Sequence, residues 1–497
     1  SADKDAGAAF LKYKDFKPYV DYFNSMEDEN IAQAVPNARA SQWMEENIPL
    51  FECSQKNFEE MYYYRWWTLR KHIKETPVGY GMTEFLVNRS YADKYNLIAC
   101  AIGHHIYESR WLRNPEYLNQ IIHTWYRGNE GGPMAKMTKF SSWNADAVLG
   151  RYMVDGNKEF LLDMVKDLEA EYARWEKTNR LSNGLYWQGD VQDGMEESIS
   201  GGRRKQYARP TINSYMYGNA KALSLIGIMT GDEGMAMKYG LKADSIKTLV
   251  QDKLWNTDHH FFETMRGDAS AEVREAIGYI PWYFNLPDAS SQYDMAWKEV
   301  MDEKGFSAPY GLTTAERRHP EFRTHGVGKC EWDGAIWPFA SAQTLTAMAN
   351  FMNNYPQTVL TDSVYFHQME RYVESQHHRG RPYIGEYLDE VTGYWLKGDQ
   401  ERSRYYNHST FNDLMITGLI GLRPRMDNTV EVNPLIPEGK WDYFCLDNVL
   451  YHGRNLTILW DKDGSRYQRG KGLHIYVDGK EVGHADTLTR VLCENVL

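Results

Sequence analysis

A helical pattern runs through roughly the first 420 residues and is broken repeatedly by long polar loops. Short stops at 155–157 and 255–258 predict tight turns between paired helices. Apolar residues recur every three or four positions, with charged residues between them, in segments 94–111, 144–153, 158–179, 213–229, 240–254, 340–353 and 362–374. This spacing predicts a mainly α-helical protein.

Longer loops rich in Gly, Pro and Trp separate the helix pairs, and they span 128–143, 182–210, 278–309, 318–338 and 377–409. Helices with short turns on one side and long loops on the other are expected to form a toroid of helical hairpins. One rim of this toroid then carries the functional residues. Because no sequence repeat is visible, the repeat is one of architecture only.

The composition changes after Arg425. Segments 429–434, 456–460 and 473–482 alternate apolar and polar residues and contain an Asp-Gly turn, which predicts β-strands. We therefore expect three parts: an N-terminal arm or extra helices at 1–50, a helical barrel at 51–425, and a small β-rich C-terminal domain at 426–497.

Composition excludes several classes of function. The net charge of −12 disfavours a nucleic-acid partner, because phosphate binding needs clustered Lys and Arg. No stretch approaches the roughly twenty apolar residues of a membrane span. Five scattered cysteines, and histidine pairs at 104–105 and 259–260 without metal-type spacing, predict neither a disulfide scaffold, a metal nor a cofactor.

The aromatic content points to a ring-binding site. The chain has 16 Trp and 35 Tyr, and both side chains combine an apolar face with a hydrogen-bonding tip. Most of these rings are expected in the core. The excess of Trp and Tyr over Phe nevertheless favours a polar cleft that binds sugar rings.

The loop at 186–198 is the most informative stretch of the sequence. It places Asp190, Asp193, Glu196 and Glu197 beside Trp187 and Gln188. Tryptophan can stack on a sugar ring, and carboxylates and amides can bind hydroxyl groups. A protonated carboxylic acid can donate to a glycosidic oxygen. A solvated acidic loop is the simpler reading, but the neighbouring glycines and Trp favour a site.

A second acidic loop lies about two hundred residues further on, at 385–395. Glu386 is its candidate general base, and Asp389 and Glu390 are local competitors. Hydrolysis of a glycosidic bond requires two carboxyl groups facing the same sugar. We therefore expect the loops at 186–198 and 385–395 to meet on one rim.

Further polar and aromatic residues on the loops are candidates for binding the substrate. Asp146 can also be explained as stabilising a helix N-terminus, and the two roles are compatible. The candidates are Trp143, Asp146, Trp187, Gln188, Asp190, Asp193, Trp282, Trp332, Asp333, Trp337, Trp395 and His408.

Ordered motifs give the chain a family resemblance over about residues 62–482. It resembles trehalase-like and glucosidase-like glycoside hydrolases with an (α/α)6 barrel, close to glycoside hydrolase family 63. It is especially similar to the mannosylglycerate-hydrolase-like domain of glycan-degrading loci in gut Bacteroidetes, a group that includes the family 142 β-L-arabinofuranosidases. The motifs are at 83–86, 103–108, 143–146, 193–201, 210–217, 280–287, 331–338 and 406–411.

The resemblance implies an (α/α)6 barrel acting as an inverting, exo-acting glycosidase. The Gly-Met-acid motif of the family matches Glu196 as general acid, where many members have Asp. The family base matches Glu386, although residues 388–391 depart from the usual pattern, and the family's sugar-binding Asp matches Asp146. An inverting route implies carboxyl groups about 6.5–9.5 Å apart.

Three alternatives stay open at this point. A glycoside phosphorylase on the same barrel would replace the base and water with phosphate. A polysaccharide lyase would need a Tyr or His base and a cation beside a uronate. A non-catalytic protein would only bind a glycan.

The expected ligand is an oligosaccharide or polysaccharide, and the protein is expected to be a monomer or weak homo-oligomer. No signal peptide is visible at Ser1. This predicts either a mature periplasmic or secreted protein or a cytoplasmic one.

Overall fold

Six inner helices form the wall of a ring. The computed structural model describes residues 10–497. Consecutive inner helices contact each other, and most begin where a long loop ends. They are α4 (Ile102–Ser109), α6 (Asn144–Asp155), α9 (Pro210–Thr230), α11 (Ile280–Tyr283), α13 (Pro338–Asn354) and the π-helix η9 (Leu414–Leu419).

A second, outer set of helices surrounds this ring and completes the (α/α)6 toroid predicted from the sequence. The inner helix α9 is buried on nearly every side over its first three turns, whereas the outer helix α5 buries one face only. The outer helices are α3 (Lys56–Arg70), α5 (Pro115–Arg127), α8 (Val165–Asn179), α10 (Glu233–Leu249), the 3-10 helix η7 (Met295–Val300) and α14 (Asp362–Ser375).

The ring closes between its first and last inner helices. The Glu108 carboxylate of α4 accepts hydrogen bonds from the backbone N–H groups of Phe411, Asn412 and Asp413 at 3.0–3.3 Å. These are N–H groups that a helix start leaves without partners. Arg110 also pairs with Asp413 at 2.8 Å, and both side chains are almost fully buried. The contacts fix the end of the chain's helical part to its beginning.

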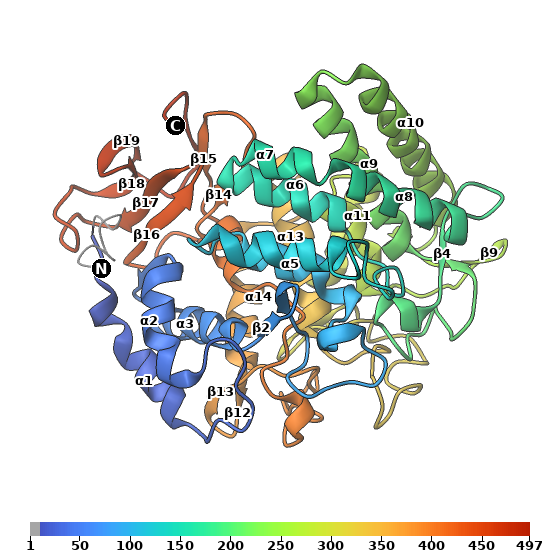
Figure 1. The fold of residues 1–497 in the computed structure, drawn as a ribbon, viewed down its shortest axis with the longest axis horizontal. Coiled ribbons are helices and arrows are strands. Elements are labelled where there is room, and N and C mark those ends of the chain that lie inside the picture. The colour runs from blue at the N-terminus through green and yellow to red at the C-terminus, as the bar shows by residue number, and fades with distance from the viewer. Residues whose placement is uncertain (1–9) are drawn as a thin grey trace.

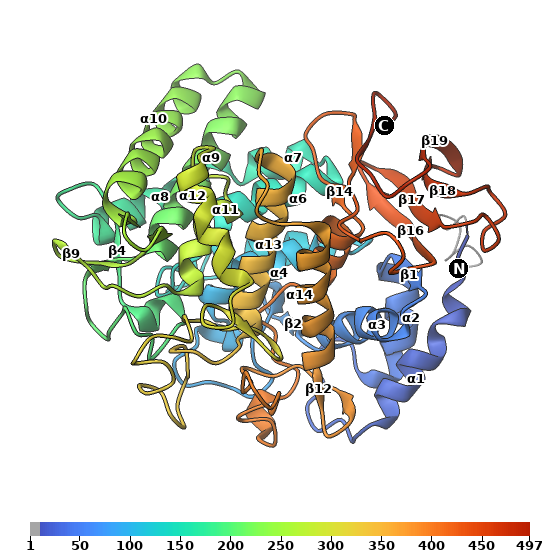
Figure 2. The same ribbon diagram turned by 180° about the vertical axis from the view of Figure 1, so that it is seen from behind.

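A five-stranded antiparallel sheet lies at one side of the ring, and the α9–α10 hairpin projects from the other side (Figures 1 and 2). The first strand of this sheet comes from the N-terminal segment. The sequence predicted strands only in the region after Arg425. The order is β1 (Leu50–Cys53), β16 (Tyr443–Tyr451), β17 (Arg454–Asp461), β18 (Gly472–Val477) and β19 (Lys480–Ala485).

Smaller elements complete the fold. A three-stranded sheet contains β14 (Leu422–Arg423), β15 (Val430–Val432) and β20 (Val491–Cys493). Further short helices are α1 (Lys17–Ser25), α2 (Asn37–Asn47), α7 (Lys158–Asp163) and α12 (Ser291–Asp294). The loops hold β2 (Ile73–Thr76), β3 (Gly79–Met82), β4 (Trp187–Gln188), β5 (Tyr207–Ala208), β6 (Trp255–Asn256), β7 (Phe261–Phe262), β8 (Met265–Arg266), β9 (Ala269–Ser270), β10 (Ser307–Ala308), β11 (Gly311–Leu312), β12 (His377–His378) and β13 (Arg381–Pro382).

Two expectations about connections had different outcomes. The turn at 155–157 is confirmed: Gly156 ends α6 with a φ of 67°, and the Asn157 side chain caps the next helix. The segment 278–309 is not one long loop, because it contains the inner helix α11 and the outer helix η7. The four residues of α11 are too few for a readable helical period.

Candidate active site

Glu196 lies in a tightly turned loop. Gly194 ends a short 3-10 turn with a φ of 74°, and a Cβ there would lie 3.2 Å from the Cys100 sulfur. Glu197 also adopts a positive φ, of 65°, a backbone strain often concentrated at functional sites. Burial, with a smaller contribution from the nearby charge of Glu386, raises the pKa of Glu196 to about 7.

Glu386 has the opposite electrostatic surroundings. The Tyr406 hydroxyl donates a hydrogen bond of 2.8 Å to its Oε2 atom. Lys397 Nζ and Arg402 Nη2 lie 3.5 and 3.6 Å from its Oε1 atom. Two cations and a hydroxyl donor thus lie within 3.6 Å of the Glu386 carboxyl group. The two expected catalytic carboxyl groups therefore have different partners.

The two loops that the sequence singled out therefore meet. Glu196 and Glu386 are close enough for the charge of one to affect the other, and no hydrogen bond joins them within residues 10–497. The charges of Glu196 and Glu386 both raise the pKa of a third carboxyl group, that of Glu84. Sequence reasoning assigned no role to Glu84, and only its place in a family motif gave a hint.

Packed rings fill the centre of the toroid. Trp143 is fully buried, with its ring centroid 4.9 Å from that of His104 and 5.0 Å from that of Tyr215. Phe339 packs against His104 at 4.5 Å, and the Trp143 indole N–H donates to the Tyr283 hydroxyl at 3.0 Å. Trp143 thus lies in the core, where no face of its ring is open to a sugar.

Asp146 lies away from the two loops. Its carboxylate accepts a hydrogen bond of 2.6 Å from the Tyr107 hydroxyl, and burial raises its pKa to about 7. It lines a polar cavity of about 660 Å³ together with Arg110 and Arg423. Neither expected catalytic carboxyl group lines this cavity. Packed rings lie between the two regions: Tyr283 contacts Trp143, and Phe339 contacts His408.

Two of the expected sugar-binding acids instead hold their own loop together. Asp193 pairs with Arg209 at 2.7 Å, and neither side chain is exposed. The Thr211 hydroxyl also donates to Asp193, at 2.5 Å. Asp190 accepts a hydrogen bond of 3.0 Å from the Ser198 hydroxyl. These internal partners leave Asp193 little capacity for a ligand, whereas Oδ1 of Asp190 is buried and has no hydrogen-bond partner within residues 10–497. The linear sequence could not show this difference.

Three other expected binding residues are also buried in the framework. Asp333 accepts the backbone N–H groups of His325 and Gly326 and so closes its own loop. Trp282 is fully buried beside other rings of the core. The Trp395 indole N–H donates to a backbone carbonyl group at 3.1 Å. These contacts hold the three side chains in the framework, and their expected role as pocket lining stays a prediction.

The remaining candidates lie near the catalytic carboxyl groups or on the loops. Trp332 stacks on Trp337 at 4.6 Å, and the ring of His408 lies 4.0 Å from that of Tyr406, the partner of Glu386. These three candidates are nearly buried. The last two are on β4, where Trp187 is half-buried and Gln188 is buried.

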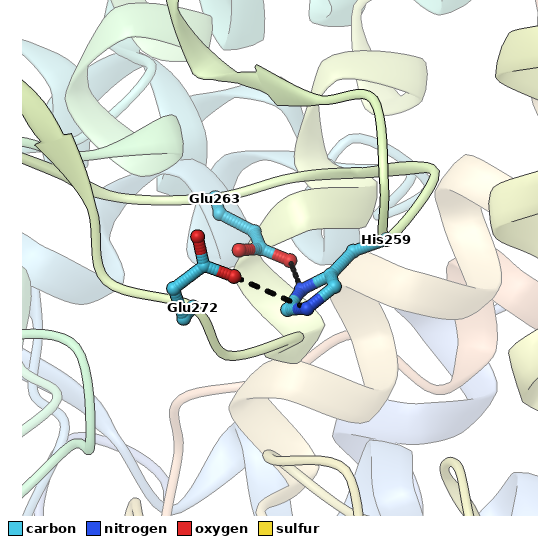
Figure 3. Close-up of side chains that lie close together, drawn as sticks. All are labelled: His259, Glu263 and Glu272. Carbon is cyan, nitrogen blue, oxygen red and sulfur yellow. Dashed lines mark hydrogen bonds and ion pairs between the residues drawn. The ribbon is translucent and has the colours of Figure 1, made fainter.

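A separate cluster of His259, Glu263 and Glu272 lies on a loop (Figure 3). The histidine contacts Glu263 at 2.6 Å through Nδ1 and Glu272 at 3.2 Å through Nε2. Ser270 and Asn256 donate to Glu263 as well. Because these groups already satisfy one another, the cluster is explained as a structural network of the loop.

None of the helices within residues 10–497 combines the length and apolar character that crossing a bilayer requires.

The chain belongs to the mannosylglycerate hydrolase MGH1-like glycoside hydrolase domain family, whose model matches residues 94–409. The matched segment contains both loops with the expected catalytic carboxyl groups. The model of the C-terminal domain of glycosyl hydrolase family 65 matches residues 422–484, which include most of the sheet. This chain thus carries a glycoside hydrolase domain, as its sequence predicted.

Solved structures agree with this fold. A structure named "Sialidase" is 83% identical, with a TM-score of 0.99; it covers 100% of this chain, which spans 46% of that longer one. The structure of the family 63 mannosylglycerate hydrolase of Thermus thermophilus in complex with Tris is 11% identical to this chain, with a TM-score of 0.55. That match covers 72% of this chain and 100% of the hydrolase. The family 78 rhamnosidase of Bacillus sp. GL1 is 12% identical, with a TM-score of 0.59, and the match covers 86% of this chain and 41% of the rhamnosidase.

Proposed function

We propose that this chain is an inverting, exo-acting glycoside hydrolase that releases a terminal sugar from an oligosaccharide or polysaccharide. Glu196 is the general acid that protonates the leaving oxygen. Glu386 is the general base that activates a water molecule on the opposite face of the sugar. Neither residue needs a metal for these roles.

The contrast between the surroundings of the two carboxyl groups carries this proposal. Burial raises the pKa of Glu196 to about 7, so it keeps a proton to donate near neutral pH. Lys397, Arg402 and Tyr406 surround the carboxyl group of Glu386, with their polar atoms 2.8–3.6 Å away. Groups whose environments separate their proton affinities are the pattern of an acid and base pair.

One further observation supports the exo-acting part of the proposal. Glu386 is only 6% exposed. A deep-lying base favours entry of a chain end over passage of a continuous polymer.

Glu196→Gln and Glu386→Gln test the assignment directly. Each is expected to lower the release of sugar from aryl glycosides and plant or host glycans at least a hundredfold, while sugar binding persists. Loss of one acid or base contribution alone accounts for about 10²–10⁴-fold. Glu197→Gln is the matched control on the same loop and is expected to retain activity within threefold. Near-normal activity in either of the first two variants removes that residue from the mechanism.

The stereochemical outcome is tested by proton NMR of the reaction as it starts. The first sugar released is expected to have the anomeric configuration opposite to that of the substrate bond. Retention of configuration contradicts the general-base role of Glu386. A requirement for phosphate in the same assay identifies a phosphorylase instead, and an unsaturated product identifies a lyase.

A terminal acidic sugar is a second candidate substrate. The 83% identical structure is named a sialidase, and two cations lie within 3.6 Å of Glu386 Oε1. Lys397 and Arg402 could bind the carboxylate of such a sugar. An aryl sialoside therefore belongs in the panel beside aryl glucosides, mannosides, rhamnosides, galactosides and arabinofuranosides, and its selective hydrolysis decides for this candidate.

A further inference from the structure

Glu84 is a buried acid that the proposed acid and base pair does not use. It is 4% exposed, and its Oε2 atom lies 3.2 Å from Nδ1 of His408. Its other oxygen accepts a weak hydrogen bond from the Cys100 thiol at 3.7 Å. The carboxyl group thus has one strong partner, the imidazole ring of His408.

The segment around Glu84 also holds the loop that contacts the proposed base. The backbone N–H of Asn407 donates to the Glu84 carbonyl at 2.9 Å, and its side chain donates to the Thr83 carbonyl at 3.0 Å. The residues on either side of Asn407 face Glu386: Tyr406 through its hydroxyl group and His408 through its ring. A contact path therefore runs from Glu84 to Glu386 through one short loop.

Of the two ring nitrogens of His408, Nδ1 contacts Glu84, and Nε2 lacks a full hydrogen bond. Nε2 is buried and has no such partner in the described chain, yet the Glu386 backbone lies close enough to favour a proton on the ring. Burial holds the pKa of His408 well below its usual range, so the ring is neutral. A neutral ring carries one N–H, and its position depends on what the other nitrogen binds.

The state of Glu84 decides that position. Burial raises the pKa of its carboxyl group well above the usual range, and the charges of Glu386 and Glu196 raise it further. A neutral carboxylic acid can donate its O–H, whereas a carboxylate can only accept. Facing a neutral imidazole at 3.2 Å, the protonated acid donates to Nδ1 and leaves the ring proton on Nε2.

We propose that Glu84 is a positioning residue for the base, because its carboxyl O–H fixes the tautomer of His408 that presents Nε2–H to the Glu386 backbone. No proton is transferred in this arrangement. The ring is held as a donor on one side and an acceptor on the other, and it fixes the loop carrying Tyr406 against Glu386. The catalytic consequence rests on the proposed function, whereas the tautomer does not.

Nitrogen NMR of the whole chain with ¹⁵N-labelled histidine tests the tautomer directly. The signals of His408 are assigned by their loss in His408→Gln. We expect a protonated Nε2 and an unprotonated Nδ1 in the wild-type protein near neutral pH. A proton on Nδ1, or a doubly protonated ring, overturns the proposal whatever the activity of the enzyme.

Two variants of Glu84 test the positioning role. Glu84→Gln keeps an N–H donor for Nδ1 and is expected to retain kcat within threefold. Glu84→Leu removes the donor and is expected to lower kcat at least tenfold with less than a twofold change in KM. A loss in Glu84→Gln as large as that in Glu196→Gln makes Glu84 a proton-transfer residue and contradicts positioning. Full activity in Glu84→Leu contradicts it equally.

The controls separate this inference from the proposed function. If Glu196→Gln and Glu386→Gln keep full activity, the proposed function fails while the NMR measurement still decides the tautomer. If those variants are inactive and the wild-type ring carries its proton on Nδ1, the inference about Glu84 fails alone.

Discussion

At the scale of single residues, the partners of each carboxyl group decide what it can do. Glu196 is half-buried, it forms no ion pair within residues 10–497, and its pKa rises to about 7. Glu386 is more deeply buried, at 6% exposed, and Lys397 and Arg402 flank it. Asp193 is wholly buried and matched by Arg209. Three acids on two loops thus have three different sets of partners.

The pH dependence of activity follows from the state of Glu196. A general acid works only while protonated, so kcat/KM is expected to fall as pH rises through about 7. A pH series with an aryl glycoside whose leaving group needs protonation measures this fall in kcat/KM. With an aryl glycoside that has a very good leaving group, kcat/KM should fall much less over the same pH range. Activity that keeps rising to pH 9 with both substrates contradicts the role of Glu196.

Asp193→Ala is expected to destabilise the protein and to act on sugar binding only through that loss. Removing one partner of a buried ion pair leaves an uncompensated charge, at a cost of about 3–5 kcal/mol. Urea unfolding measures the change. Asp163→Ala is the matched control, because Asp163 pairs with Arg127 at 2.9 Å while half-exposed, and such pairs contribute about 0–1 kcal/mol. Equal effects of the two substitutions argue against a structural role for Asp193.

At the scale of elements, the inner and outer helices differ more in how much of their surface is buried than in helical propensity. The inner helix α9 is buried nearly all round over its first half, because neighbours cover it on every side. The outer helix α5 shows a one-sided apolar stripe, with Leu118, Ile121, Ile122 and Trp125 inward. The junctions between such helices depend on turn geometry, and the turn between α6 and α7 needs a left-handed residue at Gly156.

Gly156→Ala and Gly234→Ala are expected to change stability in opposite directions. Gly156 has a φ of 67°, where a side chain costs about 1 kcal/mol. Gly234 lies in the first turn of α10, and its nearest contact for an added Cβ is an ordinary one at 3.6 Å. Alanine there is expected to stabilise by up to about 1 kcal/mol. Urea midpoints that move in the same direction contradict the assignment of these conformations.

At the scale of the whole molecule, the two ends of the chain depend on each other. Strand β1 pairs with β16 in register Leu50 to Asp447, and Phe51 packs against Trp441. The same N-terminal segment leads into the outer helix α3, which contacts α14. The proposed division at residues 50 and 425 stays a prediction, but the sheet physically joins the first part of the chain to the last.

A chain lacking residues 1–54 is expected to lose cooperative folding. Its removal strips α1, α2 and β1, and it leaves β16 as an unpaired edge, which favours aggregation. Solubility on expression and thermal unfolding measure the effect. Tyr22→Ala is the control within the same segment, because Tyr22 is 42% exposed, and it should unfold as the full chain does. A soluble truncated chain with unchanged unfolding contradicts this dependence.

Much of the fold could be predicted because long helices and alternating strands leave local patterns in the sequence. The helices at 144–155, 210–230 and 362–375 follow from apolar spacing, and the Asp478-Gly479 turn between β18 and β19 follows from its residues. The helix α11 and the strand β1 could not be predicted in this way. One has four residues, and the other is a strand only because β16 lies beside it.

The sequence alone determined the toroid of hairpins, the family and the two acidic loops, because each depends on residues close together along the chain. Only the tertiary structure decided which acids have cations, hydroxyl donors or neither beside them. It placed Trp143 in the core and Asp146 in a separate cavity, and it brought Glu84 to His408. Proton affinity depends on burial and on charges from distant segments, and neither is encoded in local spacing.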